Sequence, residues 1–188
     1  MAGPDPAVHA PAFVDPRVKP GGDGCGRFVI RRAHRRDAEA LAALIRCAYR
    51  DVAERFDLTA DNAPSHPSNC RADWITRDLA RGRRYYLLRR GGTLCGCVAL
   101  RWTAGQVAYV ERLAVPTACR RQGLGRALLD CALREAACAG KRQLRLGLIA
   151  EHVELVNWYR RRGFVWLRRE SHAHLPFTVA VYRAPIRT

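Results

Sequence analysis

The chain has 188 residues, a length that fits one domain with a substantial core. It contains no run of about 18 apolar residues, which excludes a membrane-spanning helix, and it starts without a secretory signal pattern, so a cytoplasmic location is expected. The formal net charge is +16, and 31 of the 33 basic residues are arginines. This charge favours a polyanionic ligand, but no helix-turn-helix, zinc-finger or base-stacking motif supports nucleic-acid binding.

Residues 1–26 are rich in Pro, Gly and Ala and have no hydrophobic periodicity. They are predicted to form a disordered extension ahead of a domain that spans residues 27–188. The first strand is predicted at 28–32. Asp37 then fits the N-cap of an amphipathic helix, whose apolar positions follow a 3.6-residue spacing. Those positions are Leu41, Leu44, Ile45 and Ala48.

A polar loop with two prolines follows at 55–70, and a loop of this length in a compact domain often binds a ligand. The pattern then predicts a short helix at 72–80. Two strands, 85–89 and 94–102, form a hairpin around Gly91-Gly92.

Eight cysteines occur in the chain without a C-x-x-C pair, so reduced thiols that pack as small apolar groups are expected, and no metal site is predicted. Cys95 and Cys97 are expected to face the same side of the sheet.

The remaining elements alternate between strands and helices. A strand at 107–115 leads through a basic turn into a long apolar helix at about 123–139. A strand at 144–149 and a helix ending at Gly163 follow, and strands at 164–169 and 178–183 form a final hairpin. The predicted order is β-α-α-β-β-β-α-β-α-β-β, without an internal repeat.

The turn from Arg120 to Gly125, with the sequence RRQGLG, predicts a phosphate site. It combines the N-terminus of a helix with arginine donors, and its glycines let the backbone approach a ligand closely. A P-loop is excluded because the turn has neither the GxxxxGK[ST] spacing nor its lysine. A dinucleotide-binding fingerprint is excluded because the third glycine of GxGxxG is missing.

Two motifs carry a resemblance to a known family. Arg120-x-x-Gly123-x-Gly125 resembles the acetyl-CoA signature Q/R-x-x-G-x-G/A of the GCN5-related N-acetyltransferase (GNAT) superfamily, and Tyr159-x-x-x-Gly163-Phe164 resembles its downstream Y-x-x-x-G-F. The resemblance covers roughly residues 28–188. It implies an α/β fold of the GNAT type, with a mixed, twisted sheet of about six to seven strands and about four helices on both faces.

The resemblance also implies an acetyl-CoA-dependent N-acetyltransferase that acetylates an amine of an unidentified small molecule or protein, by direct transfer in a ternary complex. Backbone N–H groups of Leu113, Ala114 and Val115 are expected to hold the thioester. The pyrophosphate is expected to bind the turn residues Arg120, Arg121, Gln122, Gly123, Leu124, Gly125 and Arg126. His152 replaces the asparagine that contacts the pantetheine arm in many relatives. Tyr159 is the candidate general acid, because a phenol can protonate a departing thiolate.

Glu111 is the preferred candidate for the general base. It lies two residues before Leu113 in the predicted strand, so it is expected to share a face with Leu113 and Tyr109. The alternative is that Glu111 only pairs with one of the many arginines. Glu151 and His152 are second candidates. For the acceptor pocket the sequence offers Asp57, Asp61, His66, His172 and His174.

Two other functions stay open at the level of sequence. One is a non-catalytic module of the same fold that binds coenzyme A for regulation, and the other, less favoured, is a basic nucleic-acid-binding protein. The many arginines favour an acidic or phosphorylated amine over a polycation as acceptor. No membrane partner is expected, and a homodimer is left open.

Overall fold

The computed structural model describes residues 28–172 and 175–186. The extension predicted for residues 1–26 and the candidate His174 therefore lie outside the described residues. None of the helices in the described part is both long and apolar enough to cross a membrane.

Seven strands form one mixed sheet in the order β1-β2-β3-β4-β5-β7-β6, which confirms the predicted α/β GNAT-type fold. All neighbouring strands are antiparallel except β4 and β5, which run parallel. The strands are β1 (Phe28–Arg32), β2 (Arg84–Arg90), β3 (Thr93–Trp102), β4 (Val107–Ala114), β5 (Gln143–Ile149), β6 (Val165–Ser171) and β7 (Thr178–Pro185).

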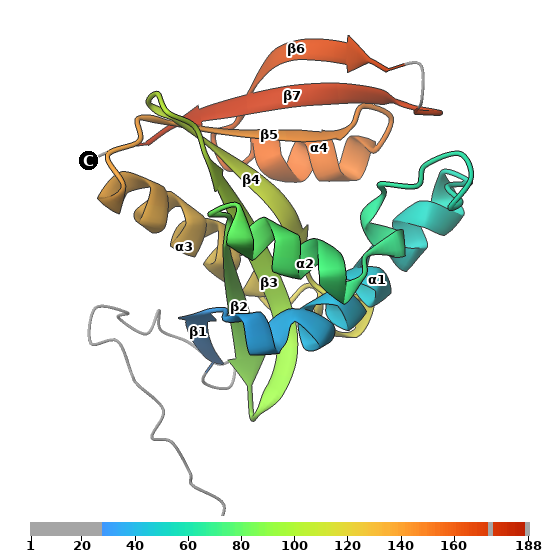
Figure 1. Cartoon of the computed structure of the whole chain (residues 1–188). Helices are drawn as coiled ribbons and strands as arrows, with labels where there is room; N and C mark the ends of the chain where they lie inside the picture. The colour runs from blue at the N-terminus through green and yellow to red at the C-terminus, as the bar shows by residue number, and fades with distance from the viewer. Residues whose placement is uncertain (1–27, 173–174, 187–188) are drawn as a thin grey trace, which may run out of the picture.

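Four α-helices cover the sheet from both sides (Figure 1). Helices α1 and α2 pack on one face of β2–β4, while α3 and α4 pack on the opposite face and extend the core under β5 and β7. The helices are α1 (Ala38–Arg55), α2 (Ala72–Ala80), α3 (Leu124–Cys138) and α4 (Val153–Arg160). Single-turn 3₁₀ helices lie at Arg35–Asp37, Pro67–Asn69 and Thr117–Cys119.

Asp37 occupies the N-cap position of α1, as predicted, but its side chain does not cap that helix. It instead accepts hydrogen bonds from the backbone N–H of His34 (2.8 Å) and from Arg31 (2.7 and 2.9 Å). The guanidinium of Arg31 therefore lowers the pKa of the Asp37 carboxyl, and the carboxylate ties β1 to the start of α1.

Strands β4 and β5 pair at only three positions and then diverge. Val107, Ala108 and Tyr109 oppose residues 143–145, and no β5 partner is found further along β4 within the described part of the chain. Backbone groups of β4 on that edge are therefore available to a ligand, since buried strand groups otherwise find partners in the sheet.

The described strands contain three shifts of register, one of them in β6, and the two that involve β3 change which predicted side chains share a face. Between β3 and β4, Cys97 opposes Ala114 and Ala99 opposes Glu111, so β4 carries one extra residue, and Arg112 there has a left-handed φ of 47°. As a result Leu113 joins the core on the α3 side, whereas Glu111 points with Arg112 to the α2 side. The expectation that Glu111 shares a face with Leu113 is wrong, although it does share one with Tyr109.

The second bulge lies at Cys95, where β2 and β3 shift register between Leu88 and Arg89. Cys95 consequently packs in the core on the α3 side, and Cys97 packs in the core on the α1 side. The expectation that both thiols face the same side is therefore wrong, because strict alternation holds only in a strand without a bulge.

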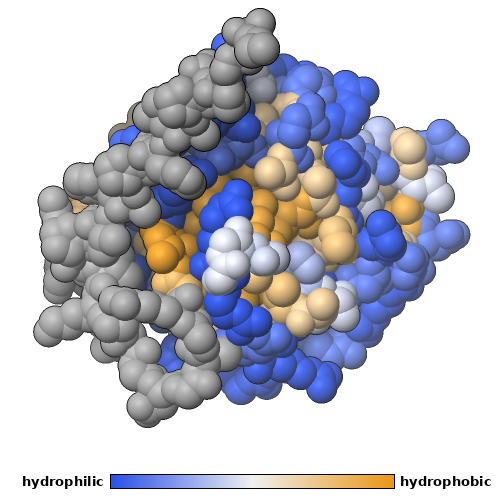
Figure 2. Space-filling model, turned by 90° about the horizontal axis from the view of Figure 1, so that it is seen from below, coloured by the Kyte–Doolittle hydropathy of each residue, from blue (hydrophilic) through white to orange (hydrophobic). Residues whose placement is uncertain are grey.

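The visible surface is not uniformly hydrophilic, despite the net charge of +16. Seen from below, hydrophobic residues gather toward the middle of the face and hydrophilic residues surround them (Figure 2). The large hydrophobic side chains that are more than half exposed in the described residues are Val29, Val153, Val165 and Trp166.

Candidate functional site

A cavity of about 1040 Å³ opens where β4 and β5 diverge. Its wall is built from α1, β4, the turn before α3, β5, α4, β6 and β7. Every residue predicted to bind the cofactor, to act as the general acid or to be the preferred general base lines it except Gln122. Those residues are Glu111, Leu113, Ala114, Val115, Arg120, Arg121, Gly123, Leu124, Gly125, Arg126, His152 and Tyr159.

The basic turn presents unpaired backbone donors to this cavity. Arg121 and Gly123 both have left-handed φ values, 60° and 77°, and Gly123 is the N-cap of α3. Within residues 28–172 and 175–186, the N–H groups of residues 121–126 have no backbone acceptor. Free amides at the N-terminus of a helix, flanked by arginines, form a site for an anion.

Arg120 contributes to the turn in a way that its sequence position did not indicate. Its guanidinium donates to the Asp51 carboxylate, to the carbonyl of Ala48 (2.7 Å) and to the carbonyl of Val115 (2.9 Å). These bonds use its Nε, Nη1 and Nη2 groups and lower the pKa of Asp51. Arg120 thus ties the turn to α1, so the contacts to the anion are left to the backbone amides and the neighbouring arginines.

Trp158 and Arg162 line the same end of the cavity. Neither residue was predicted from the sequence to belong to the site. A Cβ added to Gly125 would lie 3.4 Å from Cζ2 of Trp158, an ordinary contact distance, so there is room for a methyl group here but little room for a larger side chain. The Arg162 guanidinium stacks 3.7 Å from the centre of the Trp158 ring. Burial and the nearby positive charges of Arg126 and Arg161 lower the pKa of Arg162, which indicates concentrated positive charge where an anion is expected.

Tyr159 lies at the centre of the cavity wall and is only 6% exposed. Its ring makes edge-to-face contacts with Trp158 (4.8 Å) and Phe164 (5.4 Å), which fix its direction. Among the described residues, none hydrogen-bonds its hydroxyl group. Burial raises the pKa of this phenol, with a further contribution from Tyr49, so it stays protonated in the neutral range.

Tyr49 of α1 is a second hydroxyl at this place that sequence reasoning missed. It lines the cavity and donates a hydrogen bond to the carbonyl of Leu113 (3.3 Å). Tyr49 and Tyr159 both line the cavity, so the two phenols belong to the same site. The helical spacing of α1 predicts that Ala48, next to Tyr49, is buried. It does not predict that the Tyr49 hydroxyl reaches β4.

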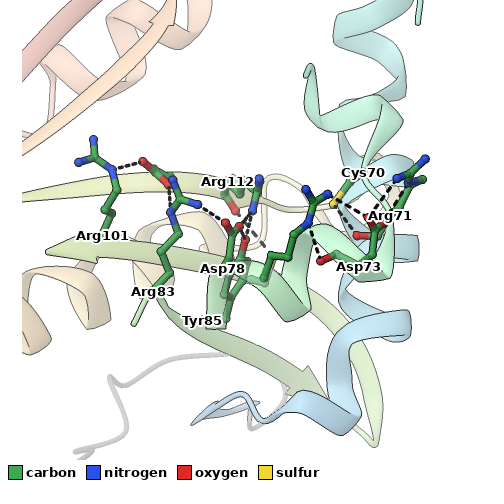
Figure 3. A network of polar contacts seen from close by, with 11 residues as sticks. Cys70, Arg71, Asp73, Asp78, Arg83, Tyr85, Arg101 and Arg112 are labelled. Atoms are coloured by element: carbon green, nitrogen blue, oxygen red, sulfur yellow. Dashed lines mark hydrogen bonds and ion pairs between the residues drawn. The ribbon is translucent and has the colours of Figure 1, made fainter. Parts of the chain in front are cut away.

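Arg83, Arg101 and Arg112 belong to a network of charged side chains with Asp78 (Figure 3), and Glu111 joins this network through two of the arginines. Its carboxylate accepts a hydrogen bond from Arg101 (2.7 Å) and lies 3.0 Å from Nε of Arg83. Arg83 also contacts the buried Asp78, which in turn binds Arg112 and the Tyr85 hydroxyl (2.7 Å). The alternative considered for Glu111, an ion pair with arginine, is therefore present, and the carboxylate still lines the cavity.

The other polar candidates divide into those near the cavity and those away from it. His152 lines the cavity, and its Nδ1 accepts from the backbone N–H of Leu155 (3.4 Å) at the start of α4. Burial is the main cause that lowers the His152 pKa. Asp57 and Asp61 are exposed and do not line the cavity, and His172 with Glu151 lines a separate smaller hollow.

His66 is buried beside Tyr49, with 5.7 Å between the two ring centres. Burial lowers its pKa to about 4, compared with an ordinary value of 6.5. As pH falls between these values, the unfolded chain takes up a proton that the folded protein does not. Stability therefore decreases across this window.

We expect the melting temperature to fall by roughly several degrees between about pH 7 and pH 4.5, and to fall less in His66→Gln. Differential scanning calorimetry over this range checks the prediction, with exposed His34→Gln as the matched control. Carboxyl groups with lowered pKa, such as Asp37 and Asp51, lose their contribution only below about pH 4. A slope that is the same in His66→Gln and in the unmodified protein would contradict the assignment.

The fold and the site define the class of protein, and comparison with known proteins agrees. Residues 38–164 match the model of the "Acetyltransferase (GNAT) family". The chain belongs to this family. A protein of Bacillus subtilis (strain 168), described as "Putative phosphinothricin acetyltransferase YwnH", is 27% identical over 141 residues, which cover 73% of this chain and 83% of that protein.

Solved structures show the same fold at low sequence identity. The ribosomal-protein-S18-alanine N-acetyltransferase from Escherichia coli matches with a TM-score of 0.68 and 17% identity, over 86% of this chain and 96% of that one. A structure described as "yncA, a putative ACETYLTRANSFERASE from Salmonella typhimurium with its cofactor Acetyl-CoA" matches with a TM-score of 0.64 and 17% identity, over 87% and 96%.

Proposed function

We propose that this protein is an acetyl-CoA-dependent N-acetyltransferase that acts by direct transfer to an amine in a ternary complex. The observation that carries the proposal is the cavity where β4 leaves β5, which joins an anion-binding helix N-terminus to an unpaired strand edge. In this one cavity, the helix N-terminus would bind the phosphate end of a ligand, and the unpaired strand edge would bind its acyl end.

The residues present fit acetyl-CoA. The free amides of residues 121–126, together with Arg121, Arg126 and Arg162, would hold its pyrophosphate. The unpaired edge of β4 at Leu113–Val115 would hold its acyl end, and backbone N–H groups aimed at a carbonyl oxygen stabilise the charge that develops there. The cosubstrate supplies an activated acetyl group as a thioester.

Two side chains of this protein would move protons. The Tyr159 hydroxyl, kept protonated by burial, would donate a proton to the leaving sulfur. Glu111 would accept the proton that the amine gives up, directly or through water, and its two arginine partners keep it oriented. No cysteine is found among the described residues that line the cavity, so the wall offers no thiol nucleophile for a covalent acetyl intermediate.

The proposal is tested by calorimetric titration with acetyl-CoA, followed by acetylation of a panel of amines. Binding and release of free CoA thiol in the presence of an amine are expected. Absence of binding at millimolar acetyl-CoA would overturn the proposal. Binding without transfer to any amine would instead favour the non-catalytic module.

Glu111→Gln is expected to lower kcat by a factor of roughly 100 and to remove the acidic limb of the pH–rate profile, because the variant cannot accept a proton. The measurement is kcat against pH with the best amine. Glu39→Gln, at an exposed position in the first turn of α1, is the matched control and should leave the profile unchanged. If Glu111→Gln lowers only the melting temperature and keeps the acidic limb, Glu111 has a structural role alone.

A further inference from the structure

The cavity continues beyond the proposed cofactor end over a face of the sheet that α1 and α2 leave open. Helices α1 and α2 pack on β2–β4 (Figure 1), and Gly147 in β5 is exposed on that same side. Strand register places side chains there in rows across β5, β7 and β6. The rows are Arg145–Arg183, Gly147–Val181–Arg168 and Ile149–Val179–Glu170.

The floor of this open face is apolar and closely packed. Gly147, Val179 and Val181 line the cavity, and a Cβ added to Gly147 would lie only 3.1 Å from Cγ1 of Val179. A floor without polar groups suits the aliphatic part of a small molecule, and selectivity is then left to the charged groups around it.

Two arginines and a tyrosine form the polar wall above this floor. The Arg101 guanidinium stacks on the ring of Tyr109, 4.2 Å from its centre. The Glu170 carboxylate, with a smaller contribution from the Tyr109 hydroxyl, raises the pKa of Arg168. All three residues line the cavity. The cavity wall thus contains two guanidinium groups, one from β3 and one from β6, together with Tyr109.

The charges at this wall leave capacity for an anion. The Nε group of Arg101 donates a hydrogen bond to Glu111. Among the described residues, no hydrogen-bond acceptor is found for its two Nη groups. Arg168 is paired with Glu170 (2.7 Å). The rows and the wall together present Arg101, Arg145, Arg168 and Arg183 against Glu111 and Glu170, and Glu111 is shared with Arg83.

We propose that Arg101 and Arg168 bind an anionic group, such as a carboxylate or phosphonate, on the acceptor amine. The inference rests on the proposed transferase function and names its substrate class. Tyr109 precedes Leu113 by four residues in β4, so an anion held beside Tyr109 is separated from the acyl end at Leu113 by a spacer of several bonds. The apolar floor accommodates that spacer.

The test uses conjugates in which the CoA sulfur is joined through a thioether-linked acetyl group to the nitrogen of glycine, γ-aminobutyrate or ε-aminocaproate. Each conjugate is compared with its neutral carboxamide by calorimetric titration. The longer carboxylates are expected to bind at least about tenfold more tightly than their amides, because the anion gains charge-assisted hydrogen bonds. This preference is expected to disappear in Arg101→Gln and in Arg168→Gln.

Arg169→Gln is the matched control, since Arg169 is exposed on the other face of the same strand, opposite Ala180. It should retain the preference for the carboxylate. The inference is overturned if carboxylate and amide conjugates bind equally at every length, or if the amides bind more tightly. In that case the proposed function still stands, provided that CoA itself binds. If CoA itself does not bind, the proposed function fails and the inference with it.

Discussion

Gly125→Val is expected to weaken acetyl-CoA binding by at least about a hundredfold, the equivalent of losing two charge-assisted hydrogen bonds. A Cβ at this position already comes within 3.4 Å of Trp158 and 4.0 Å of Leu113, so a branched side chain must push α3 away from α4 or fill the cavity. Either change disturbs the arrangement in which the free backbone amides of residues 121–126 would bind the pyrophosphate. Isothermal titration calorimetry with acetyl-CoA measures the effect.

Gly123→Val is expected to act at the same site for a different reason. Nothing lies within 4 Å of a Cβ at Gly123, but its φ of 77° is unfavourable for a β-branched residue. Gly105→Val is the matched control, because Gly105 has space around it and no left-handed φ. If Gly125→Val binds acetyl-CoA as tightly as the control does, the turn is not the pyrophosphate site.

The motifs predicted the position of the site because their chemistry depends on local sequence. The glycines of the turn and Tyr159 were predicted from two motifs that resemble those of the GNAT family, and the structure places them on one cavity. The partners of Arg120 could not be predicted in the same way. Asp51 is 69 residues away along the chain, and nothing in the sequence of α1 distinguishes it from the other exposed acidic positions.

The bulges explain the remaining errors. An extra residue at Arg112 or at Cys95 reverses the alternation that follows. In β4 no glycine or proline marks the bulge, whereas in β3 the neighbouring Gly96 is a sequence sign of one. At Arg112 the left-handed φ is accompanied by an ion pair with buried Asp78 and a contact with the Tyr85 hydroxyl. These contacts, made by residues from α2 and β2, hold the strand where its N–H groups turn toward the cavity.

The bulge places Glu111 and Leu113 on opposite faces of β4. The proposed base and the core side chain of Leu113 therefore do not compete for the same space. Leu113 packs with α3 and its carbonyl accepts from Tyr49, whereas Glu111 faces the open side where an acceptor can enter. In the proposed reaction, a single extra residue would thus separate the cofactor side of the strand from the acceptor side.

Tyr159→Phe is expected to lower kcat by a factor of roughly 100, while the affinity for acetyl-CoA changes by less than about twofold. The ring keeps its packing against Trp158 and Phe164, so only the proton donor is lost. Because burial raises the pKa of this phenol, Tyr159 should contribute no basic limb to the profile below pH 10. Steady-state kinetics and calorimetry on the same preparation separate turnover from binding.

Tyr182→Phe provides the matched control, since Tyr182 is equally buried, at 6% exposure, in the same core and does not line the cavity. It should leave kcat unchanged. The nearby hydroxyl of Tyr49 sharpens the test, because it is the other phenol that could reach the leaving sulfur. If Tyr159→Phe retains full turnover and Tyr49→Phe loses it, the proton donor is on α1 rather than on α4, and the motif residue serves packing alone.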